Sequence, residues 1–356
     1  DKHKEEVKKI LEDAGIGYVK LGKPTEERHI LVEKGDATYQ FGIDYLRDVW
    51  YSTSYLLDRK QSMNGCAKKR FENYKKQPLE FVFDKSFTGK LSQFGLNPDR
   101  RTPTGIKAAI IREKGTNGER EMAYMLYLAG FDVKDVTMTD LVSGRETLED
   151  INFIVFCGGF SNSDVLGSAK GWAGAFLFNP KAKAALDNFY ARKDTLSLGV
   201  CNGCQLMIEL NLINPDFTKK AKMLHNDSRK FESKFVGVTV PMNRSVMFGS
   251  LSGSKLGIWV AHGEGKFSLP YHEDKYNVVL KYSYDEYPGN PNGSDYSVAG
   301  LASPDGRHLA MMPHLERSCF PWQNAYYPAD RIKNDQITPW MEAFVNARKW
   351  IEMNKK

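Results

Sequence analysis

A cysteine in a glycine-flanked turn is the feature of this sequence with the most direct chemical meaning. Cys201 stands within Gly199-Val200-Cys201-Asn202-Gly203-Cys204-Gln205, after an apolar stretch typical of a buried strand and before one typical of a helix. Glycines on both sides allow a sharp strand-to-helix turn, which places the sulfur at the carboxyl end of the strand. The N-terminus of the following helix favours a thiolate there. The pattern predicts that Cys201 is a nucleophile.

A thiolate nucleophile needs a base and a group that orients the base. Among the 7 histidines, His314 stands out because it follows an apolar run, Leu309 to Met312, that predicts a strand ended by Pro313. Glu316 comes two residues after His314, and in an extended segment such residues point to the same side. We therefore expect Cys201, His314 and Glu316 to form a catalytic triad.

A pair of glycines after another predicted strand completes the expected chemistry. Gly158 and Gly159 directly follow the apolar run Ile151 to Phe156 and Cys157. Glycines at this place let a backbone N–H point into a cleft, where it can stabilise the oxyanion of a tetrahedral intermediate. We expect the N–H of Gly159 and the N–H of Asn202 to form the oxyanion hole.

Three separated motifs carry a resemblance to a known family. GVCNGCQLM, FCGGFSNSDVLGSAKGWA and MMPHLER together resemble the class I (triad) glutamine amidotransferases. GGFSNSDVLGSAKGWAGAFLFN, AHGEGKF and TPWMEAFVNARKW are most similar to the glutaminase domains of the large, single-chain phosphoribosylformylglycinamidine synthases of purine biosynthesis. The resemblance covers about residues 104–356. It implies that Cys201 is the nucleophile, and that Cys204 is a packed apolar residue on the helix.

The resemblance and the position of neighbouring residues also suggest a glutamine pocket. Its candidate residues are Gln205, Phe160, Ser161, Asp164 and His262. Simpler roles stay open: Ser161 and Asp164 can cap a helix, Gln205 can start one, and His262 can be structural. Asn162 stands where the family pattern usually has tyrosine, which can alter the edge of the pocket.

The function implied by the resemblance is hydrolysis of the L-glutamine side-chain amide, with transfer of the ammonia to the synthetase portion of the same polypeptide. That portion would bind ATP and Mg²⁺. No cofactor or metal is expected in this chain, because it has no phosphate-loop pattern. The chain begins at Asp1 rather than Met, so we expect it to be a fragment of the longer polypeptide. The Cys201–Cys204 spacing also fits a redox or zinc site, but no second pair completes one. Two other functions stay open: a stand-alone thiol hydrolase of related fold, and a non-catalytic regulatory module of a synthetase.

The composition excludes other classes of partner. The chain of 356 residues has 50 basic and 44 acidic side chains, a net charge of +6 that is too small and dispersed to indicate nucleic-acid binding. No stretch approaches the roughly 20 apolar residues of a membrane-spanning helix. The 5 cysteines lack the spacing of a disulfide framework. A cytoplasmic, reducing location is expected.

Strand and helix patterns alternate from Lys107 onward, which predicts an α/β fold with a doubly wound, mostly parallel sheet; the resemblance implies a flavodoxin-like arrangement. We expect three parts: residues 1–44 as the end of a synthetase-type α/β domain, 45–103 as a helical connector and linker, and 104–356 as the glutaminase domain. Within the first two parts we expect a helix over 4–14, strands over 16–21 and 29–33, and helices over 44–77 with Val49 and Trp50 on a core-facing stripe.

Overall fold

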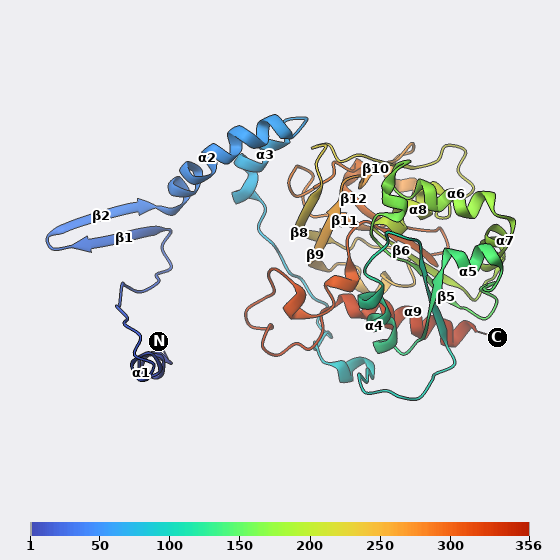
Figure 1. The fold of residues 1–356 in the computed structure, drawn as a ribbon, viewed down its shortest axis with the longest axis horizontal. Helices are drawn as coiled ribbons and strands as arrows, with labels where there is room; N and C mark the ends of the chain where they lie inside the picture. The colour runs from blue at the N-terminus through green and yellow to red at the C-terminus, as the bar shows by residue number, and fades with distance from the viewer. Residues whose placement is uncertain (1, 356) are drawn as a thin grey trace. The chain divides into compact units, whose positions relative to one another are not determined.

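A computed structural model of the protein describes residues 2–355. The chain consists of two compact units, Asp1–Ser54 and Tyr55–Lys356. The first unit contains helix α1 (Lys4–Asp13), the hairpin of β1 (His29–Lys34) and β2 (Ala37–Gly42), and the start of α2 (Ile43–Gln61) (Figure 1). Gly35 has a positive φ of 59° in the turn between β1 and β2. Two-residue hairpin turns need a positive φ, which glycine adopts without steric cost.

Two predictions for the N-terminal region were wrong. The segment 16–21 forms no strand, because no neighbouring strand in the described chain pairs with it. The apolar stripe of α2 forms on a helix but is not core: Val49 and Trp50 are 52% and 80% exposed. A unit of this size has no second layer of secondary structure to cover such a stripe.

The second unit is built on a nine-stranded sheet with the order β4-β3-β5-β6-β13-β12-β11-β8-β9 (Figure 1). The pairings from β4 to β13 are parallel, and those from β13 to β9 are antiparallel. The parallel pairings with intervening helices confirm the α/β class. The antiparallel half of the sheet is larger than the sequence indicated. The nine strands are β3 (Lys107–Arg112), β4 (Asp132–Thr137), β5 (Phe153–Phe156), β6 (Leu196–Val200), β8 (Glu232–Thr239), β9 (Lys255–His262), β11 (Asn277–Tyr282), β12 (Val298–Ala302) and β13 (His308–Met311).

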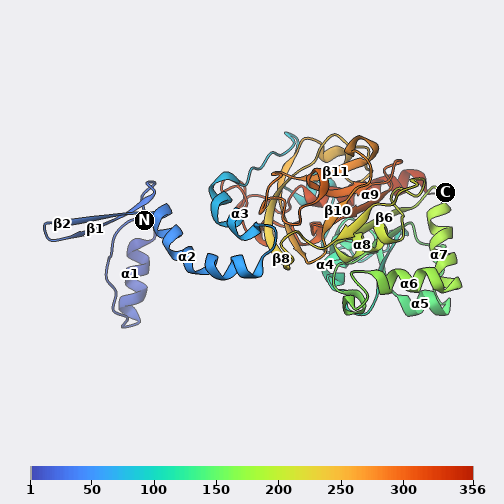
Figure 2. The same cartoon turned by 90° about the horizontal axis from the view of Figure 1, so that it is seen from above.

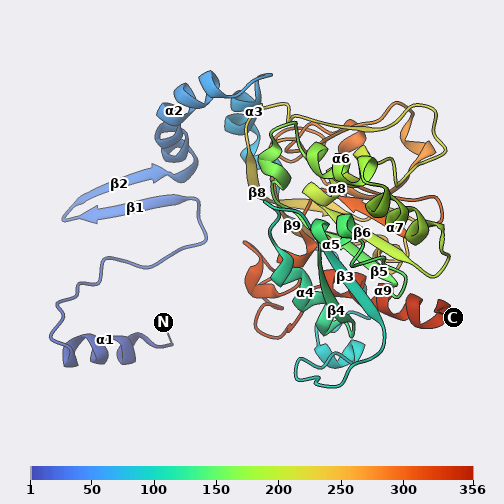
Figure 3. The same cartoon turned by 45° about the vertical axis from the view of Figure 1, so that its right-hand side comes forward.

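Helices cover the parallel half on both faces. The central strands β5 and β6 are buried along their whole length, as expected of strands packed on two sides. The chain moves from β3 to β4 in one direction along the sheet and from β4 to β6 in the other, so the right-handed connections usual in parallel sheets put α4 on the opposite face from α5 to α7. Helix α8 packs against α6. Figures 2 and 3 show α5, α6 and α7 grouped together, and α9 contacts α4. These helices are α4 (Glu119–Leu128), α5 (Met138–Ser143), α6 (Lys170–Phe178), α7 (Pro180–Ala191), α8 (Asn202–Glu209) and α9 (Trp340–Asn354).

The remaining elements connect these layers. The connector contains α3 (Cys66–Asn73), and a short two-stranded sheet pairs β7 (Lys222–Leu224) with β10 (Lys266–Ser268). Within the described residues no helix is long and apolar enough to cross a bilayer.

The strand order reverses at β3, whose neighbours β4 and β5 follow it in different directions along the sheet. In doubly wound sheets, ligands bind outside the carboxyl ends of the strands at such a point. The loops after β3 and β5 meet there, since Thr116 and Gly159 form a backbone bridge. The fold therefore brings the predicted glycine loop to the edge where the nucleophile strand also ends.

Candidate active site

Cys201 occupies a strained turn between β6 and α8. Its φ of 53° and ψ of −106° are unfavourable for a residue with a side chain, and such strain is found at functional sites. The two flanking glycines are required by packing. A Cβ on Gly199 would lie 2.5 Å from the Gly203 carbonyl oxygen, and one on Gly203 would lie 2.0 Å from that of Phe156. The strand–turn–helix expected from the sequence is therefore present.

His314 and Glu316 form a buried pair directly after β13. His314 Nδ1 lies 2.7 Å from Glu316 Oε1, and both side chains are almost fully buried. The backbone N–H of His314 donates to the Trp259 carbonyl at 2.8 Å, which anchors the histidine to β9. The expected geometry of this segment needs a correction: Leu315–Arg317 is a 3₁₀ turn rather than an extended chain. The turn still directs the carboxylate to the imidazole.

The electrostatics of this pair favour a charged imidazole. Burial opposes the charge on His314, but the Glu316 carboxylate and a hydrogen bond with Cys201 outweigh it and raise the pKa of His314 to about 10. The pair therefore stabilises the imidazolium that forms when the thiol gives up its proton.

Gly158 lies between the cysteine and the histidine. A Cβ at this position would lie 3.3 Å from Cys201 Cβ and 2.8 Å from His314 Cε1. The structure thus brings Cys201 and His314, from two separate loops, against one glycine on a third loop, and Glu316 follows His314 in the same turn. The Cys201 thiol also contacts the Ala261 carbonyl oxygen at 3.4 Å, which fixes the side chain from the β9 side.

The glycine loop is held so that its N–H groups remain available. Asn117 N–H donates to the Gly158 carbonyl at 2.9 Å, and Phe160 N–H donates to the Gly115 carbonyl at 2.8 Å. Gly159 has a φ of 121°, and a Cβ there would clash with the backbone of residues 115–117. Within residues 2–355, neither the Gly159 N–H nor the Asn202 N–H has an acceptor. Both are therefore free to bind an oxyanion.

A chain of hydrogen bonds links the glycine loop, the elbow helix and the loop after β9. Ser161 N–H donates to Asn202 Oδ1 at 3.1 Å, and Asn202 Nδ2 donates to Gln205 Oε1 at 2.9 Å. Gln205 Nε2 then donates to the Glu264 carbonyl at 2.7 Å. This network fixes three loops relative to Cys201.

Three of the five residues predicted to bind glutamine carry a buried polar atom without a hydrogen-bond partner in the described chain. These atoms are Ser161 Oγ, Asp164 Oδ1 and His262 Nε2. Burial and the nearby charge of Glu264 raise the pKa of Asp164, whereas burial and the charge of His314 lower the pKa of His262 to about 3. Buried polar groups are normally satisfied, so these atoms are suited to ligand contact.

The fourth and fifth candidates differ from these three. Phe160 is half exposed, with its ring 5.8 Å from that of Phe231. Gln205 is buried, and its amide takes part in the network described above. Asn162, the departure from the family pattern, has a positive φ of 51°, a conformation that asparagine tolerates well.

Cys204 packs as the resemblance implied. It is fully buried on α8, and burial raises the pKa of its thiol well above the usual value. All five cysteines are free thiols. Residues 2–355 contain no cluster of three or more His, Cys, Asp and Glu side chains suited to a metal ion.

Sequence reasoning missed the groups that hold the site from a distance. The Ala261 carbonyl contacts Cys201 and the Trp259 carbonyl contacts His314. Arg317 Nη2 donates to Asn117 Oδ1 at 2.7 Å, which joins the loop after β13 to the loop after β3. The first two are backbone groups of an ordinary β-strand, so no residue pattern could have revealed them.

Comparisons with known proteins agree with this geometry. Residues 105–351 match the family described as the CobB/CobQ-like glutamine amidotransferase domain. The chain is 40% identical to a probable phosphoribosylformylglycinamidine synthase, chloroplastic/mitochondrial, of Arabidopsis thaliana over 334 residues, which cover 86% of the chain and 23% of that protein. It is 38% identical to the phosphoribosylformylglycinamidine synthase of Homo sapiens, over 97% of the chain and 28% of that protein.

Among solved structures, PurLQS from Thermotoga maritima is similar with a TM-score of 0.53 and 27% identity, covering 70% of this chain and 99% of that chain. The chain spans about a quarter of the length of the curated relatives that it matches.

Proposed function

This chain belongs to the family of CobB/CobQ-like glutamine amidotransferase domains, and from this premise we propose that it hydrolyses the side-chain amide of L-glutamine and supplies ammonia to a phosphoribosylformylglycinamidine synthase reaction. The observation that carries the proposal is the strained Cys201 elbow, which meets His314 of the buried His314–Glu316 pair around Gly158. The relatives named above support the choice of the synthase.

The proposed mechanism assigns one task to each group. Cys201 Sγ attacks the carboxamide carbon, and the N–H groups of Gly159 and Asn202 stabilise the oxyanion. His314, oriented by Glu316, gives a proton to the nitrogen as the C–N bond breaks, so ammonia leaves and a γ-glutamyl thioester remains. His314 then takes a proton from water, which attacks the thioester; the C–S bond breaks, glutamate departs, and Cys201 is regenerated.

Two carboxylates are suited to the α-ammonium group of glutamine. Ser168 binds both of them: its hydroxyl donates to Asp164 Oδ2 at 3.2 Å and its N–H donates to Glu264 Oε2 at 3.4 Å. The resulting negative charge and the free Asp164 Oδ1 favour a cationic ligand. We propose that Asp164 and Glu264 select glutamine through this group, with Ser161 and His262 as further contacts.

The rest of the reaction belongs to the synthetase portion, which we propose as the partner that binds ATP and Mg²⁺ and accepts the ammonia. No step assigned to this chain uses them. The five free thiols support a reducing compartment, for which we propose the cytoplasm.

The deciding experiment is mass spectrometry of the chain after reaction with 6-diazo-5-oxo-norleucine, an alkylating glutamine analogue, followed by peptide mapping. We expect one adduct, on Cys201, that is absent in Cys201→Ser and retained in the matched control Cys204→Ser. An adduct on Cys204 would refute the assignment of the nucleophile. Peptide cleavage without glutamate release would favour a thiol hydrolase of another class.

A further inference from the structure

A row of aromatic side chains crosses the surface of the second unit beside the candidate active site. Tyr127, Tyr124, Phe320 and Trp322 follow one another with ring centroids 6.4, 6.1 and 6.0 Å apart. Trp322 and Tyr124 are 78% and 43% exposed. We call these four residues the aromatic row. Large exposed aromatic surface is costly in water and is typical of surfaces that bind another protein.

One end of the row borders a cavity that reaches the catalytic histidine. This cavity of about 470 Å³ is lined by His314, Ala261, Trp259, Arg317 and Trp322, among others. Ala261 is the residue whose carbonyl contacts the Cys201 thiol. Ammonia released beside His314 can therefore enter this cavity and reach the surface next to Trp322.

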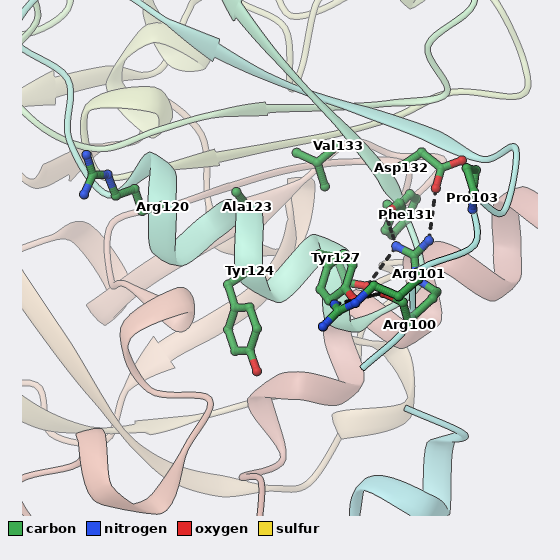
Figure 4. A pocket seen from close by; sticks show the side chains of 10 residues that line it. All are labelled: Arg100, Arg101, Pro103, Arg120, Ala123, Tyr124, Tyr127, Phe131, Asp132 and Val133. Carbon is green, nitrogen blue, oxygen red and sulfur yellow. Dashed lines mark hydrogen bonds and ion pairs between the residues drawn. The ribbon is translucent and has the colours of Figure 1, made fainter. Parts of the chain in front are cut away.

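The other end of the row lies in a shallow groove of about 580 Å³ along α4. Figure 4 shows Arg120 at one end of this groove and Arg100 and Arg101 at the other, with Tyr124 and Tyr127 between them. The acidic residue in the groove, Asp132, is already satisfied by Arg100 and by the N–H groups of residues 104 and 105.

Two positive charges in this groove lack an acidic partner. Arg120 and Arg101 form no ion pair with any residue between 2 and 355, whereas Arg100 pairs with Asp132. Tyrosine, tryptophan and arginine are the residues that contribute most to protein–protein binding. The groove therefore fits a partner surface with apolar side chains flanked by carboxylates.

We infer that the aromatic row and the arginine groove form the docking surface for the ammonia-accepting portion of the synthase, which covers the cavity at His314 when it docks. The inference rests on the proposed function. Relatives that match this chain are about four times as long, so most of such an enzyme lies outside these residues. A cover over the cavity would keep ammonia from the solvent, where it would be protonated and lost as a nucleophile.

The test uses the full-length synthase polypeptide with Trp322→Ala or Arg120→Glu. Four rates are measured: labelling of Cys201 by the glutamine analogue, release of glutamate, amidation driven by glutamine, and amidation driven by added ammonium chloride. We expect both variants to lose glutamine-driven amidation relative to glutamate release, while Cys201 labelling and ammonium-driven amidation stay at the wild-type level. Trp322→Phe, which keeps a ring, should restore much of the coupling.

Matched controls separate docking from general damage. Phe178→Ala removes an aromatic ring that is 88% exposed at the end of α6, and Lys193→Glu reverses an exposed charge after α7; neither should alter coupling. Unchanged glutamine-driven amidation in both row variants would overturn the inference, as would an equal loss of ammonium-driven amidation. If wild-type enzyme neither labels at Cys201 nor releases glutamate, the proposed function itself fails, and this inference falls with it.

Discussion

Adding one methyl group at Gly158 should slow glutamine hydrolysis without unfolding the protein. The new Cβ would lie 2.8 Å from His314 Cε1, so the imidazole must retreat by about 0.6 Å to reach an ordinary contact of 3.4 Å. Gly158 does not have a positive φ, so alanine adds no backbone strain there. The perturbation therefore acts mainly on the position of His314, with a smaller effect on Cys201, whose Cβ would lie 3.3 Å from the new methyl group.

The expected size follows from the demands of the reaction. A displacement of 1 Å in a catalytic arrangement can cost about 100-fold in rate, so a shift of about 0.6 Å predicts a loss of about tenfold or more in kcat. The loss should appear in kcat more than in KM, because Gly158 contacts His314 and Cys201 rather than the predicted glutamine-binding residues.

The assay is glutamate release at saturating glutamine, with the unfolding temperature measured in parallel. Gly249→Ala is the matched control, since a Cβ on Gly249 meets nothing within 4 Å and should leave kcat unchanged. A Gly158→Ala enzyme with wild-type kcat would refute the geometry described for the triad. A large fall in the unfolding temperature would refute the claim that the effect is local.

Three further predictions concern charge and burial. Glu316→Gln should lower the pKa of His314 and reduce kcat by about 100-fold or more, measured as glutamate release. In the folded protein the pKa of His314 is raised to about 10, so its contribution to stability is fully present below its ordinary pKa of 6.5 and is lost as pH rises through 10. The difference in the free energy of unfolding between wild type and Glu316→Gln, measured in urea, should therefore shrink between pH 7 and 10. A constant difference would contradict the pairing. Asp164→Asn and Glu264→Gln should each raise KM for glutamine by about tenfold. Hydrolysis of glutaramate, which lacks the α-ammonium group, should stay unchanged, and an equal loss for both substrates would exclude the proposed contact. Cys204→Asp should destabilise the fold, because it places a charge at a fully buried position, whereas Cys204→Ala should cost about 1 kcal/mol and keep activity; a stable, folded aspartate variant in thermal unfolding would contradict the burial.

Local patterns were most reliable where the chain itself supplies the constraint. The elbow at Cys201 could be predicted because a sharp turn between a buried strand and a helix requires glycine at Gly199 and Gly203, and the structure confirms this packing. The apolar stretch before Cys201 forms β6 (Leu196–Val200), and the run Ile151 to Phe156 contains β5 (Phe153–Phe156), since continuous apolar runs of this length suit a sheet buried on both faces.

Predictions failed where a contact with a distant segment decides the outcome. Residues 16–21 have strand-like composition, but none of the described residues forms a strand beside them, and Trp50 lies on an apolar stripe that the described chain leaves exposed. Secondary structure without a partner layer lacks the burial that would stabilise it. The 3₁₀ turn at Leu315–Arg317 was missed because the path of the chain after β13 depends on the bridge between His314 and Trp259, which lies far away in the sequence.

The sequence by itself determined the local pattern of the candidate site: a cysteine in a glycine turn, a histidine with a carboxylate two residues later, and a pair of glycines after a strand. Each of these is a local requirement that residue types and spacing express directly. Only the tertiary structure decided how these groups meet. The carbonyl that contacts the Cys201 thiol comes from Ala261, 60 residues away, and the antiparallel strands that carry it join the sheet through β13. Such contacts leave no pattern in the chain, because any residue at that place in a strand offers the same backbone oxygen.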